Sequence, residues 1–464
     1  MSASLIDRIK AIVGENGIIT AADELAPYLT DWRRSYTGRA LAVVRPSNTD
    51  EVAAVVKCCV EARTPIVPQG GNTSMVGGSV PDATGRAIVL SLTRMNRIRS
   101  IDTDNDNIVA EAGVILQNLQ SAAADAGRLF PLSLAAEGSC TIGGNLSTNA
   151  GGTNVLRYGN TRDLVLGLEV VTASGEIWHG LSGLRKDNTG YDLKHWFVGA
   201  EGTLGIITAA SLKLFPQPQM RAVAMVAVAT PADAVKLLNR MKRAFADRLV
   251  GFELIARACV ALVLRHIPNT REPFATPQAW QVLIELNDSR ADAPIGEWLE
   301  GELAMAFDEG EALDAVIASS DSQINELWRM REEISEAQRL EGRNVKHDIS
   351  IPISRIPTFI ATCDAALVSA FPNIALVCFG HLGDGNLHYN CGLPAQGLAN
   401  AEAINKIVYQ HVVEYGGSIS AEHGIGQLRR DELSLHKSAV AVGMMRQLKH
   451  ALDPHNLMNP GKVL

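Results

Sequence analysis

Three loops rich in glycine and hydroxyl residues, each next to a predicted strand, constrain this chain more than any other feature. They span residues 69–78, 138–152 and 199–208. Glycine lets a backbone come close to a ligand and turn its N–H groups towards an anion. The loops match neither a Walker loop nor a Gly-x-Gly-x-x-Gly turn, and any one of them could be an ordinary flexible turn. Three in succession predict one extended nucleotide site on a framework of strands.

A chain of 464 residues is longer than one hydrophobic core usually holds, so more than one domain is expected. The order of the predicted elements indicates where the domains begin and end. Strands at 42–45 and 65–68 flank a helix that begins near residue 49, a β-α-β opening, and a strand pair follows at 165–171 and 175–178. Pro216-Gln217-Pro218 marks a domain boundary. The expected parts are an N-terminal helical segment 1–35, domains at 36–217 and 218–425, and a C-terminal segment 426–464 that folds back on the first domain.

The second domain alternates strands and helices and is expected to form an α+β layer, a sheet backed by helices. Its predicted strands are 222–229, 280–285 and 374–378, and its predicted helices are 231–246, 321–341, 356–370 and 401–414.

Two short runs near the end of this domain carry metal-ligating residue types. Asp384-Gly385 suits a tight reversal between apolar runs, so His381 and His388 are expected near the mouth of a hairpin, with Asn390 on the side of His388. Adding Glu422 gives two imidazole nitrogens and a carboxylate oxygen, a set that suits Zn²⁺ or a similar divalent ion. His423 is then free to move a proton. The alternative is that these histidines are hydrogen-bonding loop residues.

Composition excludes several classes of protein. A net charge of −8 without a basic stripe argues against a nucleic-acid partner. No apolar run reaches the length of a bilayer span, and the N-terminus has no apolar signal core. The seven cysteines form no CxxC pair, which argues against an iron–sulfur cluster and favours a reduced, cytoplasmic setting.

From about residue 20 to 464 the chain resembles the vanillyl-alcohol-oxidase/PCMH flavoprotein superfamily, on its FAD-linked D-2-hydroxyacid dehydrogenase branch. The resemblance rests on five runs in the right order: 68–73, 143–152, 199–208, 381–388 and Glu422-His423. It implies a two-subdomain PCMH-type FAD-binding domain followed by an α/β cap domain with an antiparallel sheet.

The resemblance also implies FAD bound across residues 36–217, with its pyrophosphate on the 70–74 loop. Covalent members often have a histidine where this chain has Asn72, and Cys140 lies in no pattern typical of a flavin bond, so non-covalent FAD is expected. The residues expected to bind it are Pro68, Gln69, Gly70, Gly71, Asn72, Thr73, Ser74, Gly138, Thr141, Gly143, Gly144, Ser147, Thr148, Asn149, Gly151, Gly152, Arg157, Tyr158, Glu201, Gly202, Gly205, Ile206, Ile207 and Asn459.

By the same resemblance, His381, His388 and Glu422 hold a divalent metal, with Zn²⁺ favoured, and His423 is the catalytic base and touches the substrate. Substrate carboxylate recognition falls on four further residues: Arg331, Ser335, Lys346 and Asn390. Arg331 and Ser335 are four residues apart in the predicted helix and would share one face. Without the resemblance, Arg331 would be read as a solvated salt bridge on a helix surface.

The implied reaction is oxidation of a D-2-hydroxyacid to its 2-oxoacid. D-2-hydroxyglutarate is favoured, and D-lactate and D-malate remain open. Since no NAD fingerprint is present, a protein or quinone acceptor is expected to take the electrons, and a homodimer is a family-level expectation. The rival interpretations are an oxygen-using flavin oxidase of the same superfamily, a metallohydrolase that uses the His/His/Glu set, and a flavin-binding scaffold without turnover.

Overall fold

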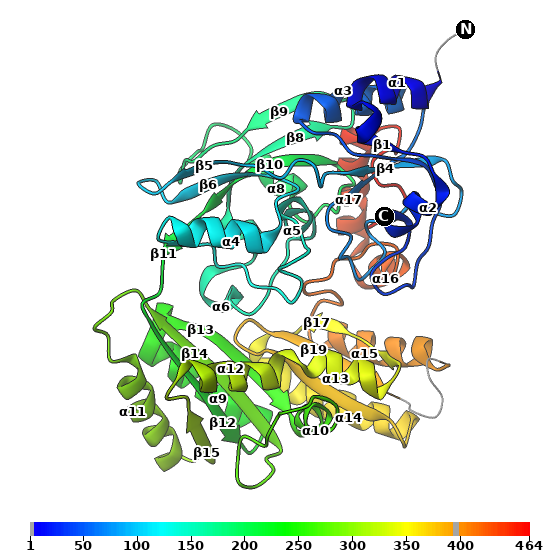
Figure 1. The fold of residues 1–464 in the computed structure, drawn as a ribbon. Coiled ribbons are helices and arrows are strands. Elements are labelled where there is room, and N and C mark those ends of the chain that lie inside the picture. The colour runs from blue at the N-terminus through cyan, green and yellow to red at the C-terminus, as the bar shows by residue number, and fades with distance from the viewer. Residues whose placement is uncertain (1–3, 393–398) are drawn as a thin grey trace. The chain divides into compact units, whose positions relative to one another are not determined.

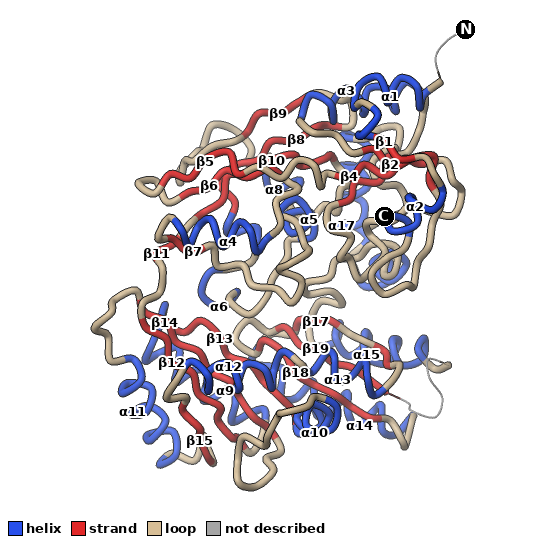
Figure 2. The backbone as a smooth tube through the Cα atoms, in the orientation of Figure 1, coloured by secondary structure: helices blue, strands red, loops and turns tan. Residues whose placement is uncertain are grey.

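The computed structural model describes residues 4–392 and 399–464 and divides the chain into two compact units. The first unit holds residues up to 151, residues 159–217 and residues 422–464. The second holds 152–158 and 218–421. Both units combine strands and helices (Figures 1 and 2).

A four-stranded sheet in the order β1-β2-β4-β3 opens the first unit. Strands β2, β4 and β3 are parallel, and α3 forms the crossover from β2 to β3. Asn48 caps α3 by accepting a hydrogen bond from the Glu51 N–H at 2.9 Å. The elements are α1 (Leu5–Val13), β1 (Ile18–Ile19), α2 (Ala22–Leu29), β2 (Ala40–Val44), α3 (Thr49–Glu61), β3 (Ile66–Gln69) and β4 (Ala87–Ser91).

A five-stranded antiparallel sheet in the order β5-β6-β10-β8-β9 completes the β-structure of this unit, apart from the short β7–β11 pair. β8 and β10 are buried along almost their whole length, including the polar residues Glu169, Thr208 and Ser211. The elements are β5 (Ile98–Asp102), β6 (Asn107–Glu111), α4 (Leu116–Asp125), β7 (Arg128–Leu129), α5 (Ile142–Thr148), α7 (Thr161–Leu164), β8 (Val165–Thr172), β9 (Ile177–Gly180), α8 (Lys194–Phe197), β10 (Gly205–Lys213) and β11 (Phe215–Pro216).

The C-terminal segment of the first unit contains α16 (Arg430–His436) and α17 (Ala439–Leu452) and packs on the first sheet through its last residues. Asn459 N–H donates to the Ile66 carbonyl at 2.8 Å, and the Ile66 N–H donates to the Leu457 carbonyl at 2.8 Å. Lys449 Nζ donates to the Thr203 carbonyl at 2.8 Å and to Asp453 at 2.6 Å. These bonds fix the tail against the strand that leads into the first glycine loop.

Lys462 in this tail is 3% exposed, and burial lowers the pKa of its ammonium group to about 8 although Asp82 opposes the shift. The unfolded chain therefore binds more protons than the folded one between about pH 8 and pH 10.5, so stability should rise across this range. Below pH 8 the full cost of burying the charge is present. We expect Lys462→Met to raise the free energy of unfolding at pH 7 by about 3 kcal/mol and to flatten its rise above pH 8. Urea unfolding from pH 7 to pH 10 measures both, and equal slopes for the two proteins would contradict the expectation.

The second unit is built on an antiparallel sheet in the order β15-β12-β14-β13-β18-β19-β16, with β17 paired to β19. One apolar core joins its strands to its helices. The elements are α6 (Val155–Tyr158), β12 (Met220–Val228), α9 (Pro231–Phe245), β13 (Leu249–Ala256), α10 (Arg257–His266), β14 (Trp280–Asp288), α11 (Ile295–Asp308), β15 (Asp314–Ile317), α12 (Asp321–Glu332), α13 (Ile334–Glu341), β16 (Asn344–Val345), β17 (Asp348–Ser350), α14 (Ile356–Ala370), β18 (Ala375–His381), β19 (Asn386–Gly392) and α15 (Ala401–Glu414).

The single helix predicted over 321–341 is wrong, because the structure has two helices, α12 and α13, on either side of Glu333. α12 packs on β12 and β14, whereas α13 packs on α10, so the chain changes direction between the two sets of partners. The predicted fold class is confirmed: parallel and antiparallel sheets in the first unit, and a helix-covered antiparallel sheet in the second.

Candidate active site

The three glycine-rich loops meet in the first unit, and their glycines permit the close approach. A β-carbon on Gly71 would lie 1.9 Å from the Ser139 carbonyl oxygen, and one on Gly70 would lie 2.3 Å from Thr141 Oγ1. A β-carbon on Gly202 would lie 3.1 Å from the Pro68 ring. The structure therefore brings together predicted cofactor residues from all three loops.

Two buried polar atoms fit a ligand at this place. Thr141 Oγ1 and Asn459 Oδ1 are buried and have no hydrogen-bond partner among the residues that the structure describes. Buried polar groups are usually paired, so a bound polar molecule is the simplest partner for them. Both residues belong to the set predicted to bind FAD.

Other predicted cofactor residues use their side chains to shape the first loop. Gln69 Nε2 donates to the carbonyls of Tyr28 at 2.9 Å and Ser79 at 2.8 Å. Asn72 has φ +53° and donates from Nδ2 to the Thr30 carbonyl at 2.9 Å. Ser74 Oγ accepts the Gly78 N–H at 3.2 Å. The side chains of Gln69, Asn72 and Ser74 are thus engaged within the protein, so a ligand would bind mainly to the backbone of these residues.

The second loop forms α5, whose hydroxyls bind its own backbone. Ser147 Oγ donates to the Gly143 carbonyl at 2.7 Å and Thr148 Oγ1 to the Gly144 carbonyl at 3.1 Å. Asn149 ends the helix at φ +51° and accepts the Arg162 N–H at 2.9 Å. The loop is thus rigid before any ligand binds.

Glu201 ties the third loop to the segment that follows His423. Its carboxylate accepts the Ile425 N–H at 2.7 Å and the Gly426 N–H at 2.8 Å. Asn459 Nδ2 donates to the carbonyls of Glu201 at 2.7 Å and Gly78 at 2.9 Å. Burial raises the pKa of the Glu201 carboxyl, and these N–H groups oppose the shift.

Arg157 and Tyr158 lie outside this group. Both were predicted to bind FAD within 36–217, as was Gly152, and the structure groups segment 152–158 with the second unit. Arg157 Nη1 donates to the Asn287 carbonyl at 3.2 Å, and its guanidinium carbon lies 4.8 Å from the centre of the Tyr158 ring.

Two residues of these loops, Asn72 and Cys140, indicate whether FAD could be attached covalently. Asn72 is engaged with protein carbonyls, and burial raises the pKa of the Cys140 thiol to about 11, which makes it a poor nucleophile at neutral pH. We expect acid precipitation of the purified protein to release the yellow colour into the supernatant. Colour that stays with the pellet would contradict non-covalent binding.

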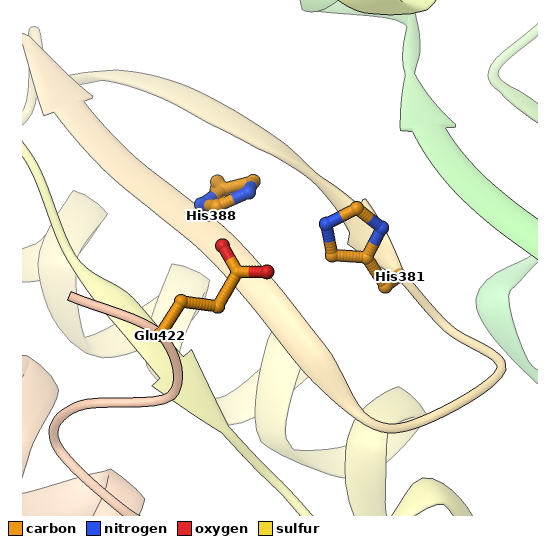
Figure 3. A group of neighbouring side chains, drawn as sticks. All are labelled: His381, His388 and Glu422. Atoms are coloured by element: carbon orange, nitrogen blue, oxygen red, sulfur yellow. The ribbon is translucent and has the colours of Figure 1, made fainter. Parts of the chain in front are cut away.

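The β18–β19 hairpin carries the predicted metal ligands of the second unit. His381 ends β18 and His388 lies on β19, and their ring centres are 5.7 Å apart. Glu422 directly follows this unit, and the Ala421 N–H before it donates to the Asp348 carbonyl at 3.2 Å. One ligand atom from each of His381, His388 and Glu422 lies within 4.8 Å of the other two, and the side chains converge (Figure 3). Two imidazoles and a carboxylate at this spacing suit a divalent ion.

Asp348 was not singled out in the sequence. It forms a second group with Glu422 and His423, again with ligand atoms within 4.8 Å, and it lies opposite His388 in the strand register. Asn386 Nδ2 donates to Asp348 Oδ1 at 3.0 Å. Asp348 lies in a short strand, and the sequence around it contains no motif that would indicate a metal ligand.

Glu253 is the second residue that the sequence did not single out. It lies on β13 and is 1% exposed. Its Oε1 lies 2.7 Å from His381 Nδ1, and its Oε2 accepts from Arg331 Nε at 2.7 Å. Burial alone would raise the pKa of this carboxyl, but the charges of His381 and Arg331 outweigh it and lower the pKa to about 2. The sequence feature that could have identified Glu253 is a single carboxylate in the otherwise apolar run 249–256. A charge at a buried position needs a partner, so such a carboxylate indicates an ion pair.

The predicted substrate residues have different surroundings. Arg331 is buried against Glu253 and Phe379 and is not a solvated salt bridge on a helix surface. Ser335 is exposed on α13 and Lys346 is half-buried between β16 and β17. Asn390 is buried, with Nδ2 donating to Gln338 Oε1 at 2.9 Å and Oδ1 accepting the His347 N–H at 3.1 Å. Arg331 and Ser335 do not share one continuous helix face, since α12 ends between them.

Two family models match separate parts of this chain. Residues 40–180 match the FAD binding domain, and residues 217–463 match the C-terminal domain of FAD linked oxidases. A D-2-hydroxyglutarate dehydrogenase of Xanthomonas citri is 38% identical over 96% of this chain and 93% of its own. A mitochondrial D-2-hydroxyglutarate dehydrogenase of Arabidopsis thaliana is 39% identical over 99% of this chain and 81% of its own.

The fold also matches solved structures of distant sequence. The structure of p-cresol methylhydroxylase with substrate bound superposes with a TM-score of 0.76 at 18% identity, over 99% of this chain and 96% of that one. The matches to the two FAD-linked domains define an FAD-binding oxidoreductase. The chain belongs to the FAD-linked oxidase family, and the two relatives described above carry the name D-2-hydroxyglutarate dehydrogenase. The resemblance inferred from the motifs is confirmed. In the part of the chain that the structure describes, no helix has both the length and the apolar character needed to cross a membrane.

Proposed function

We propose that this protein oxidises D-2-hydroxyglutarate to its 2-oxoacid, with FAD as the hydride acceptor and a divalent metal, Zn²⁺ by preference, on His381, His388 and Glu422. The convergence of these three side chains carries the proposal. The choice of substrate is supported by relatives of that name that match nearly the whole chain. Bound FAD would supply the redox chemistry, and a bound metal ion would lower the pKa of the substrate hydroxyl.

The protein's own residues bind, orient and deprotonate the substrate in this proposal. Arg331, with help from Ser335 and Lys346, binds carboxylate oxygens and so fixes which hydrogen on C2 faces the flavin. His423 follows Glu422 in the chain, and its imidazole is proposed as the base that takes the proton of the hydroxyl. Asn390 supports the site through its bonds to Gln338 and His347.

The electron acceptor is proposed to be a protein or a quinone, because the sequence has no Gly-x-Gly-x-x-Gly turn for NAD. Seven free cysteines, all buried, support a reducing compartment such as the cytoplasm. The Arabidopsis relative is described as mitochondrial.

The visible spectrum under anaerobic conditions tests the function. We expect a flavin spectrum that bleaches on addition of D-2-hydroxyglutarate, more slowly with D-lactate or D-malate, and regains colour slowly in air. Rapid peroxide formation in air would favour an oxidase. A colourless protein would favour the metallohydrolase, and a yellow protein that no hydroxyacid bleaches would reject the substrate class.

Metal removal tests the second part of the proposal. Dialysis against a chelator is expected to leave FAD bound and to slow its reduction by D-2-hydroxyglutarate by about 100-fold or more, since metal catalysis contributes several kcal/mol. Added Zn²⁺ should restore the rate. An undiminished rate in protein shown to be free of metal would remove the metal from the mechanism.

A further inference from the structure

We propose that Glu253 is a positioning residue that holds a metal ligand, His381, and the substrate clamp, Arg331, in one hydrogen-bonded chain. The inference rests on the proposed function, because it takes His381 to bind the metal and Arg331 to bind a substrate carboxylate. In this proposal Glu253, a residue of the sheet interior, fixes the distance and orientation between His381 and Arg331.

The sheet register puts Glu253 in place for this task. Glu253 on β13 lies directly opposite His381 on β18, so the two side chains project from neighbouring strands on the same face. Arg331 reaches the other carboxylate oxygen from α12. Each oxygen of one buried carboxylate therefore has one partner, at 2.7 Å in both cases.

The contact with His381 decides which ring nitrogen is offered to a metal. His381 Nδ1 faces Glu253 at 2.7 Å, so Nε2 is the nitrogen that can act as its ligand atom in the group with His388 and Glu422. Figure 3 shows one nitrogen of His381 directed towards these two side chains and the other directed away from them. A carboxylate on the second nitrogen fixes the tautomer of a metal-binding histidine and increases its basicity.

The contact with Arg331 leaves the outer part of the guanidinium available. Glu253 uses only Nε, and the Phe379 ring lies 4.9 Å from the guanidinium carbon. These two contacts fix the plane of the guanidinium group. Neither terminal nitrogen of Arg331 has a hydrogen bond to the residues that the structure describes, so both can form a paired contact with a carboxylate.

Glu285 on the neighbouring strand shows what a purely structural pair of this kind looks like. It is also buried, accepts from Arg221 at 2.9 Å and 2.6 Å, and accepts from Trp328 Nε1 at 2.7 Å. Like Glu253, Glu285 lies within a strand of this sheet, pairs with an arginine and contacts a residue of α12. Among the described residues, no histidine of the metal group is a hydrogen-bond partner of Glu285, which makes it a matched control.

The test compares Glu253→Gln with Glu285→Gln in the FAD-loaded protein. Zn²⁺ affinity is measured by competition with a chelator, and KM and kcat for D-2-hydroxyglutarate by anaerobic turnover with a redox dye as the electron acceptor. We expect Glu253→Gln to weaken Zn²⁺ binding by about 10–100-fold and to raise KM, and Glu285→Gln to change neither, whatever its effect on stability. Glu253→Asp keeps the charge beside Arg331 with a shorter reach, and it takes the place of Glu253→Gln if that variant does not fold.

Wild-type Zn²⁺ affinity in the folded Glu253 variant, or an equal loss in Glu285→Gln, would overturn the inference. The proposed function fails separately, if the unmodified protein binds no Zn²⁺ or is not reduced by the hydroxyacid. A double variant with Arg331→Lys adds a check: if Glu253 acts on KM through Arg331, Glu253→Gln should raise KM much less in that background.

Discussion

Replacing His423 by alanine is expected to slow flavin reduction by D-2-hydroxyglutarate by about 10²–10⁴-fold, the usual contribution of a positioned general base. The imidazole follows the metal ligand Glu422 directly, and one of its nitrogens lies within 4.8 Å of ligand atoms of Glu422 and Asp348. No other imidazole belongs to this second group. FAD should stay bound, because the glycine loops that are proposed to hold it do not include His423.

Stopped-flow absorbance of the flavin band under anaerobic conditions measures this effect. His455→Ala is a suitable control, because His455 lies exposed in the C-terminal tail of the same unit. It should reduce at the wild-type rate. A His423→Ala protein that retains FAD and is reduced at the wild-type rate would remove His423 from the role of base.

Local sequence signals were sufficient for many elements of the second unit. Helices α14 and α15 begin and end where the sequence predicted, at 356–370 and 401–414. Both carry regular apolar positions at helical spacing, and α14 has a proline in its first turn. The turn around Gly385, at φ +90°, likewise marked the hairpin that brings His381 and His388 together.

Relations between distant strands could not be predicted in this way. No element was predicted over the ranges of β13, α10, α11 or β15. β13 ends at Ala256 and α10 begins at Arg257, so no turn residue separates the strand from the helix in this apolar run. Without β13 the pairing of Glu253 with His381, which are 128 residues apart, had no basis. The partner of Arg331 was missed for the same reason, and only the fold shows that the guanidinium is buried. Gln69 and Asn72 were predicted to bind the cofactor, but nothing in the sequence indicated that their side chains also bind carbonyls in α2 and just after it, more than 40 residues earlier.

Glu201→Ala is expected to combine a loss of stability with a loss of activity. The carboxylate of Glu201 is buried and accepts the N–H groups of Ile425 and Gly426, two and three residues after His423. Removing it leaves both donors without their partner, at about 1–3 kcal/mol for each buried group. Alanine would also have to adopt the left-handed conformation of Glu201, at φ +52°, without any bond to hold it there.

The loss of activity follows from the same two bonds. They fix the segment that carries Glu422 and His423 to the third glycine loop, so their removal lets the base and one metal ligand move relative to that loop. Because catalysis depends on distances within a fraction of an ångström, kcat should fall by about 10²-fold even where the variant is fully folded.

Urea unfolding followed by circular dichroism, together with anaerobic flavin reduction, separates the two effects. Glu176→Ala is the control, since Glu176 lies exposed in the β8–β9 turn of the same unit and should change stability by less than about 0.5 kcal/mol. Glu201→Gln keeps the side-chain volume and one acceptor oxygen, so its stability should fall between those of wild type and Glu201→Ala. The two hydrogen bonds of Glu201 hold both the third glycine loop and the segment that bears His423. A Glu201→Ala protein with normal stability and normal kcat would therefore show that the N–H groups of Ile425 and Gly426 find other partners. The segment that bears His423 would then be held by the rest of the C-terminal tail.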